Sequence, residues 1–150
     1  MLRWQWKTFA ELTLDELYRL LALRQEVFVV EQQSIYQDVD GYDRGSHHLL
    51  GSTGEPQALF LAASLRVLPP GLKYPEASLG RVVTSPRVRR HGYGKALVDQ
   101  GLTFLAAHYP GAPVRIAAQH YLLRFYSGFG FRPVGEVYDE DGIPHLDMVR

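Results

Sequence analysis

Five cationic side chains gather where a predicted strand gives way to a predicted helix. Between Ala77 and Val98 there is no acidic residue, but there are Arg81, Arg87, Arg89, Arg90 and Lys95. A helix N-terminus already carries about half a positive charge, so each nearby cation costs about 0.3–1 kcal/mol. Gly92 and Gly94 leave the backbone N–H groups open to close approach by an anion. The pattern predicts that residues 89–94 bind a phosphate-bearing ligand, the alternative being a basic surface turn.

Two common nucleotide-binding motifs do not fit this turn. A Walker A loop requires a glycine five residues before Gly-Lys and a hydroxyl residue after it, but Arg89 and Ala96 occupy those positions. A dinucleotide-binding fingerprint requires a third glycine, and Leu97 stands there instead. The ligand is therefore expected to be a phosphate compound of another kind.

The spacing Arg/Gln-x-x-Gly-x-Gly/Ala, met by Arg89, Gly92 and Gly94, resembles the signature of the GNAT-superfamily N-acetyltransferases. In that family a Gln or Asn follows, then a Tyr seven residues later, then Gly-Phe. Here Gln119 precedes Tyr126 by seven residues, and Gly-Phe follows at 128–129. The segments 23–32, 36–49, 136–138 and 142–145 look like the ElaA-type branch of the superfamily, so the resemblance covers essentially the whole chain.

The resemblance implies that acetyl-coenzyme A is the acyl donor. It places the pyrophosphate on the turn and the pantetheine arm beside the preceding strand. The cofactor-binding residues implied in this way are Val82, Val83, Thr84, Arg89, Arg90, His91, Gly92, Tyr93, Gly94, Lys95 and Gln119.

Acetyl transfer to an amine requires a stabilised oxyanion, a neutral amine and a proton for the departing thiolate. Tyr126 is the predicted general acid, because a phenol with a pKa near 10 holds its proton at neutral pH. Such help accelerates a reaction by roughly 10²–10⁴-fold. The alternative is that Tyr126, which lies among phenylalanines, only fills the core. Direct transfer needs no covalent enzyme intermediate, in keeping with the absence of cysteine.

The general base stays open at this point, and a chain of water molecules is one alternative. The titratable candidates are Glu31, Asp38, Asp40, Asp43, His47, His48, Glu136 and His145. Some family members carry a Glu early in the strand before the turn, whereas this chain has Ser78 and Gly80 there. Arg81 either anchors a substrate carboxylate or packs against an acidic partner, and Glu31 and His48 are further candidates for contact with the acceptor. No metal site is expected, because the six histidines lack ligand spacing.

The acceptor is predicted to be a primary amine of a small molecule or peptide. Two acidic clusters would attract it, although turn formation also explains the second: Asp38/Asp40/Asp43 and Glu136/Asp139/Glu140/Asp141. Two rival functions remain. One is a non-catalytic acyl-coenzyme A sensor. The other is an acyltransferase like the acyl-homoserine-lactone synthases, because Arg24 and Phe28 resemble residues near the start of those enzymes. Those synthases use acyl-carrier protein, however, and they lack a good Arg-x-x-Gly-x-Gly turn, which this chain has.

The elements that must position these residues follow from the hydrophobic pattern. A capping box at Thr13 and Glu16 starts a helix of about five turns, and residues 94–108 and 122–128 form two more. Residues 34–46 form a long loop. Strands are expected at 2–7, 47–51, 58–67, 78–84, 114–118, 134–138 and 144–149, the last two as a hairpin. This order predicts an α+β domain over residues 1–150, a three-layer α/β/α GNAT-like fold on a mixed, mostly antiparallel six- to seven-stranded sheet.

The amino-acid composition limits the classes of partner that this protein is expected to bind. The chain has 150 residues, 46% hydrophobic and 21% charged, with a formal net charge of +0. Neither nucleic acid nor an anionic membrane is expected to attract a neutral chain. No signal-peptide pattern is present at the start, which favours a cytoplasmic protein. A homodimer is possible by resemblance to the superfamily.

Overall fold

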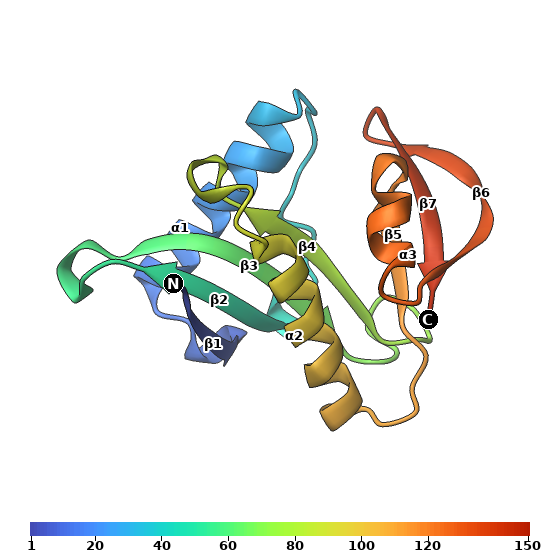
Figure 1. Ribbon diagram of the computed structural model, residues 1–150, viewed down its shortest axis with the longest axis horizontal. Coiled ribbons are helices and arrows are strands. Elements are labelled where there is room, and N and C mark those ends of the chain that lie inside the picture. The colour runs from blue at the N-terminus through green and yellow to red at the C-terminus, as the bar shows by residue number, and fades with distance from the viewer.

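In the computed structural model, which describes residues 1–150 apart from the side chain of Pro56, seven strands form two antiparallel sheets (Figure 1). The first sheet has the order β1 (Arg3–Thr8), β2 (His47–Thr53), β3 (Phe60–Leu68) and β4 (Ser78–Thr84). The second has the order β5 (Arg115–Gln119), β7 (Ile143–Val149) and β6 (Arg132–Glu140). The predicted α+β fold is confirmed, with its strands divided between two sheets.

Helix α1 (Leu14–Arg24) begins at the predicted capping box. The Glu16 N–H donates to Thr13 Oγ1 at 3.1 Å, and the Thr13 N–H donates to Glu16 Oε1 at 2.9 Å. The helix continues as a π-helical segment, Gln25–Glu31, so the two together make the predicted five turns. Their apolar face packs on the first sheet through Leu20, Leu23, Val27, Leu50, Leu61 and Val83.

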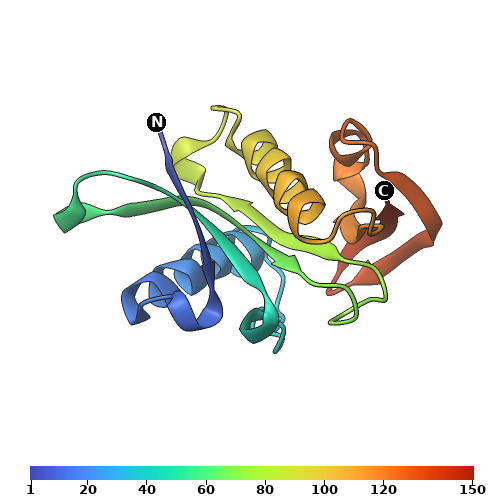
Figure 2. The same cartoon turned by 90° about the horizontal axis from the view of Figure 1, so that it is seen from below.

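Helix α2 (Tyr93–His108) covers the opposite face of the same sheet, as Figure 2 shows. Its Leu97, Val98, Phe104 and Leu105 belong to the main hydrophobic core, together with Leu65, Val67 and Leu79 of β3 and β4. The first sheet is therefore the middle layer of an α/β/α arrangement, as predicted. Among the described residues, no helix is both long and apolar enough to cross a membrane.

The second sheet carries helix α3 (Leu123–Ser127) and the predicted hairpin between β6 and β7, which turns at residues 141–142. Tyr126 of α3 packs edge-on against Phe125 and Phe131, with ring centroids 5.1 Å and 6.0 Å away. This half lies beside the end of the first sheet (Figure 1).

The two halves meet at a single parallel bridge between Ala77 and Val114. The Ala77 N–H donates to the Pro113 carbonyl at 3.1 Å, and the Arg115 N–H donates to the Ala77 carbonyl at 2.8 Å. Beyond this bridge the described strands β4 and β5 form no further ladder, so their facing edges diverge. The divergence leaves unpaired backbone groups along both strands, and the candidate site lies there.

Candidate active site

A cavity of about 600 Å³ opens between β4 and β5. Its walls also include the β3–β4 loop, the β6–β7 turn and the end of the α1 segment, by which we mean helix α1 with its π-helical continuation and the capping Gln32, residues 14–32. Of the predicted site residues, the cavity wall includes Glu31, Arg81, Val82, Val83, Thr84, Arg89, Gln119 and Tyr126. The structure thus brings together the strand, the start of the turn and the Gln–Tyr pair, which are up to 45 residues apart in the sequence, and also Glu31, which precedes Tyr126 by 95 residues.

The rest of the predicted turn lies outside the cavity wall, at the N-terminus of α2. Gly92 is the N-cap residue and has φ of +76°, a left-handed conformation that favours glycine. No side chain among the described residues caps this helix, in contrast to α1, where Thr13 does. The first N–H groups of α2 lack intrahelical acceptors, so they are free to bind an anion.

Arg89 already has a partner in this structure. It contacts Glu31 through two nitrogens, at 2.7 Å and 2.5 Å, and this ion pair links the predicted turn to the end of the α1 segment. The hydrogen bonds from Arg89 lower the pKa of Glu31. Among the described residues, no carboxylate lies within ion-pair distance of Arg87, Arg90 or Lys95. The Arg87 guanidinium lies over the Phe60 ring, 5.3 Å from its centroid, whereas Arg90 and Lys95 remain available to a phosphate group.

Gln119, at the end of β5, also contacts the α1 segment. Its side-chain amide exchanges two hydrogen bonds with that of Gln32, each of 3.2 Å. Both glutamines line the cavity. The end of the α1 segment therefore contacts both sides of the cavity: Glu31 pairs with Arg89, which follows β4, and Gln32 bonds Gln119 at the end of β5.

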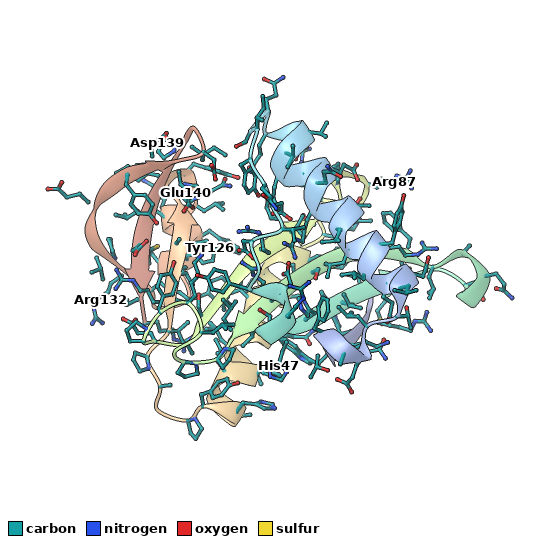
Figure 3. The ribbon with its side chains drawn as sticks, turned by 180° about the vertical axis from the view of Figure 1, so that it is seen from behind. His47, Arg87, Tyr126, Arg132, Asp139 and Glu140 are labelled. Carbon is teal, nitrogen blue, oxygen red and sulfur yellow. The ribbon has the colours of Figure 1, made fainter. Side chains whose placement is uncertain are left out.

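The position of Tyr126 is compatible with both roles considered from the sequence, a core residue and a general acid. Its ring is packed in the core, and the residue is only 7% exposed. The residue also lines the cavity, and its hydroxyl has no hydrogen-bond partner among the described side chains. Burial raises the pKa of Tyr126 well above its ordinary value, so the phenol holds its proton at neutral pH. Figure 3 shows Tyr126 between the two halves of the molecule.

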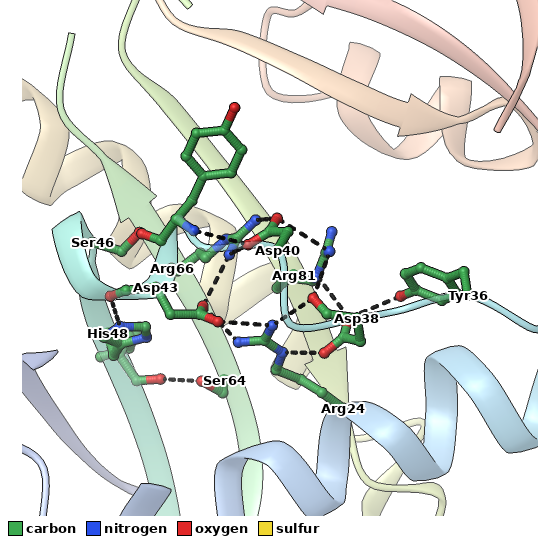
Figure 4. Close-up of polar contacts among 12 residues, drawn as sticks. Arg24, Tyr36, Asp38, Asp40, Asp43, Ser46, His48, Ser64, Arg66 and Arg81 are labelled. Carbon is green, nitrogen blue, oxygen red and sulfur yellow. Dashed lines mark hydrogen bonds and ion pairs between the residues drawn. The ribbon is translucent and has the colours of Figure 1, made fainter. Parts of the chain in front are cut away.

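One side of the cavity is built on a closed ring of three arginines and three aspartates (Figure 4). Asp38 joins Arg24 to Arg81, Asp40 joins Arg81 to Arg66, and Asp43 joins Arg66 back to Arg24, with N–O distances of 2.6–3.3 Å. The Nε atom of Arg81 lies 2.8 Å from Asp38 Oδ1 at an angle too oblique for a hydrogen bond. All three aspartates come from the loop 34–46, so the ring fixes this loop against α1, β3 and β4.

A β-bulge in β4 directs Arg81 into this ring. Ser64 pairs with Val83 and Arg66 pairs with Gly80, so two β4 residues oppose one β3 residue. Arg81 occupies the bulge with φ of +49°, a strained value for a residue with a side chain. Of the two roles predicted for Arg81, the structure shows the ion pair with acidic partners. The acidic cluster Asp38/Asp40/Asp43 is likewise neutralised internally rather than offered to an amine.

The ring makes the fold sensitive to acid. Burial raises the pKa of Asp40, but the hydrogen bonds and charge of Arg66 outweigh it and hold the pKa well below its ordinary value. The pKa of Asp43 is lowered in the same way by Arg24 and Arg66. A depressed folded-state pKa stabilises the fold above the unfolded-state pKa of about 4. This contribution is lost as the pH falls below that value.

We expect the free energy of unfolding, measured by urea titration, to decrease from about pH 5 down to about pH 2. Asp40→Asn removes one of the responsible carboxylates, so this variant should be less stable at pH 6 yet lose less stability on acidification. An equal acid dependence in the two proteins would contradict the account.

The eight candidate bases differ in whether they lie on the cavity wall and in whether they are already held in ion pairs. Five of them lie away from the cavity wall, Asp38 and Asp43 among them. Of the other three, the His47 ring is tilted against Phe104 with centroids 4.9 Å apart, His48 is fully buried with Nε2 2.9 Å from the Asp43 carbonyl oxygen, and Glu136 is exposed. The predicted acceptor contact of His48 is therefore not supported by its position. Asp38, Asp40, Asp43 and Glu31 are held in ion pairs.

His145 is the remaining candidate on the cavity wall. Its Nδ1 lies 2.7 Å from the Ile143 carbonyl oxygen. A carbonyl only accepts hydrogen bonds, so Nδ1 carries the proton and Nε2 has a free lone pair in the neutral ring. The Glu140 carboxylate lies 3.4 Å from Nε2 and stabilises the positive charge that proton uptake creates.

Sequence reasoning missed several wall residues. Gln32, Tyr36, Lys73 and Tyr74 come from segments that periodicity marks only as a helix end or a loop. The one sequence signal that could have pointed to this part of the wall is the single lysine of the β3–β4 loop, Lys73, which stands beside Tyr74. Among the described residues, no group of three or more histidine, aspartate or glutamate side chains is arranged to hold a metal ion.

The family model for the acetyltransferase (GNAT) domain matches residues 70–150. ElaA of Escherichia coli is 41% identical over 152 aligned residues, covering 100% of this chain and 97% of ElaA. The chain belongs to the GNAT acetyltransferase family. The crystal structure of Escherichia coli ElaA superposes with a TM-score of 0.89, covering 100% of this chain and 99% of that one.

A second GNAT-like structure is that of an acyl-CoA N-acyltransferase from Pseudomonas aeruginosa. It is 43% identical, with a TM-score of 0.92, and the match covers 100% of this chain and 99% of that one. A CoA-dependent acyl-homoserine lactone synthase, 17% identical with a TM-score of 0.76, shares the fold over 99% of this chain and 82% of its own. This synthase depends on CoA, in contrast to the acyl-carrier-protein-dependent synthases considered above.

Proposed function

We propose that this GNAT protein transfers an acetyl group from acetyl-coenzyme A directly to a primary amine of a small molecule or peptide. The observation that carries the proposal is the Tyr126 hydroxyl, which is unpartnered among the described side chains and lines the cavity between two diverging strands. A purely structural tyrosine at this depth normally satisfies its hydroxyl with a hydrogen bond.

The donor would bind along the diverging edge of β4 and reach the N-terminus of α2. The uncapped N–H groups of α2 and the unpaired cations Arg90 and Lys95 suit its pyrophosphate. The edge of β4 that faces the cavity has no strand partner beyond Ala77. Its N–H groups are therefore free to stabilise the oxyanion that forms on the thioester carbonyl.

In the transfer step, the amine nitrogen forms a bond to the acetyl carbon and the carbon–sulfur bond breaks. The Tyr126 hydroxyl gives its proton to the departing sulfur. We assign His145 Nε2 as the acceptor of the amine proton, because its tautomer is fixed by Ile143 and Glu140 lies beside it. Solvent returns a proton to Tyr126 and removes one from His145, so the enzyme ends unchanged.

The rival function, a non-catalytic sensor of acyl-coenzyme A, shares the binding step but not the chemistry. Thermal shift with acetyl-coenzyme A tests binding, and release of free thiol with a panel of primary amines tests transfer. We expect both binding of acetyl-coenzyme A and release of free thiol. Binding without thiol release across a broad panel would favour the sensor, and no binding would overturn both functions.

Replacing Gly92 with valine is expected to weaken binding of acetyl-coenzyme A at least tenfold by calorimetry. A β-branched residue resists the left-handed φ of +76° and shields the N–H groups of α2. The matched control is Gly111→Val, because Gly111 follows α2 with φ of +78° and also has open space around it. Equal binding by Gly92→Val and the parent protein would remove the turn from the site.

A further inference from the structure

Lys73 is a half-buried cation on the cavity wall without a carboxylate partner. It comes from the loop between β3 and β4, and its ammonium lies 5.5 Å from the ring centroids of both Tyr42 and Tyr74. Among the described residues, no aspartate or glutamate oxygen lies within 4.0 Å of its Nζ. A charge withdrawn from water in this way costs free energy unless an anion accompanies it.

The groups around Lys73 do not neutralise it. In the ring of ion pairs, the three aspartates balance the three arginines, so the charge of Lys73 is left over. Burial lowers the pKa of Lys73, and the positive charges of Arg66 and Arg81 lower it further, whereas Glu140 and Asp40 act in the opposite direction. The Glu140 carboxylate lies beside His145 and more than 4.0 Å from the Lys73 Nζ atom, and Asp40 already pairs with Arg66 and Arg81.

A second unsatisfied donor lies on the same wall. Arg66 is only 2% exposed and lines the cavity, yet its Nε–H has no hydrogen-bond partner among the described residues. A buried N–H without a partner is uncommon and costs about 1–3 kcal/mol. The Arg66 Nε atom is closed off from the cavity space, so the unpaired ammonium of Lys73 is the feature of this wall that calls for an acceptor oxygen.

We propose that Lys73 binds a carboxylate of the acyl acceptor, so that the acceptor is an amine that also carries a free carboxylate, such as an amino acid. This inference rests on the proposed function. One carboxylate matches the single charge of the Lys73 ammonium, whereas a doubly charged phosphate would be repelled more strongly by the nearby Asp40 and Glu140. The carboxylate oxygens accept from the ammonium, and Tyr42 and Tyr74 flank the contact.

The test measures binding without turnover. The full-length protein saturated with coenzyme A, which has no acyl group to transfer, is titrated by calorimetry with L-amino acids and with their carboxamides. We expect the free acids to bind about ten- to a hundredfold more tightly than the carboxamides, as for a hydrogen bond between charged groups. In Lys73→Met this preference should fall to less than about twofold.

Comparing the acid-to-carboxamide ratio between the two proteins cancels differences in amine basicity between the ligands. The control is Arg132→Met, which removes an exposed cation outside the cavity wall and should keep the preference. Lys73→Gln serves as a second variant if the methionine variant melts early, and it should lose the preference too.

Three results would overturn the carboxylate site: acids and carboxamides binding alike or not at all, a preference that survives in both Lys73 variants, or tighter binding of O-phosphoethanolamine than of any amino acid. Failure of coenzyme A itself to bind would instead count against the proposed function. The two failures are thus distinguished in one experiment.

Discussion

Tyr126→Phe is expected to lower kcat for acetyl transfer about 100-fold or more, while the affinity for acetyl-coenzyme A changes less than about twofold. General acid catalysis contributes roughly 10²–10⁴-fold, and phenylalanine keeps the ring packing against Phe125 and Phe131. Because the hydroxyl has no partner among the described side chains, its removal orphans no group in the protein. Steady-state assay of free thiol gives kcat, and calorimetry gives the affinity.

The matched control is Tyr109→Phe, which removes a hydroxyl from a tyrosine at the far end of α2, packed against the same core. It should leave kcat within about twofold. An unchanged kcat in Tyr126→Phe would remove Tyr126 as the acid. A large loss of cofactor affinity in that variant would instead make Tyr126 a binding residue.

The second large effect concerns stability. Arg24→Met is expected to lower the free energy of unfolding by about 3–5 kcal/mol, because it leaves Asp38 and Asp43 buried with fewer partners. Arg24 is only 1% exposed, so water cannot replace the lost contacts. Urea denaturation, with the midpoint and slope compared to the parent protein, provides the measurement.

Arg19→Met is a control on the same helix. Arg19 pairs with Asp15, but both side chains are largely exposed, so this pair contributes only about 0–1 kcal/mol. If the two substitutions cost the same, burial would not govern the strength of these ion pairs. The ring would then be a surface network without a special role in fixing the loop 34–46.

The helices and strands were predictable because they follow from local patterns. The capping box at Thr13 and the apolar spacing behind it specify α1, and the turn at residues 141–142 specifies the last hairpin. The division into two sheets was not predictable, because it depends on a single bridge between Ala77 and Val114. The local conformational preferences of residues in a strand do not indicate where that strand stops pairing with the next one.

For the site, the sequence supplied the turn and the Gln–Tyr pair, since fixed spacing carries them. It did not supply the ring of ion pairs, because Arg24, Arg66 and Arg81 come from three separate elements. A run of aspartates in a loop looks the same whether it faces water or buried arginines. His145 was one of eight candidate bases, and only its place on the cavity wall and its contact with Ile143 distinguish it.

The central claim is that the diverging edge of β4 and the N-terminus of α2 together hold acyl-coenzyme A. Hydrogen–deuterium exchange, followed by mass spectrometry with and without acetyl-coenzyme A, tests it directly. We expect slower exchange in peptides that cover residues 82–84 and 92–96, and unchanged exchange in β1 and β2. Protection confined to other segments, or absent from both of these, would contradict it.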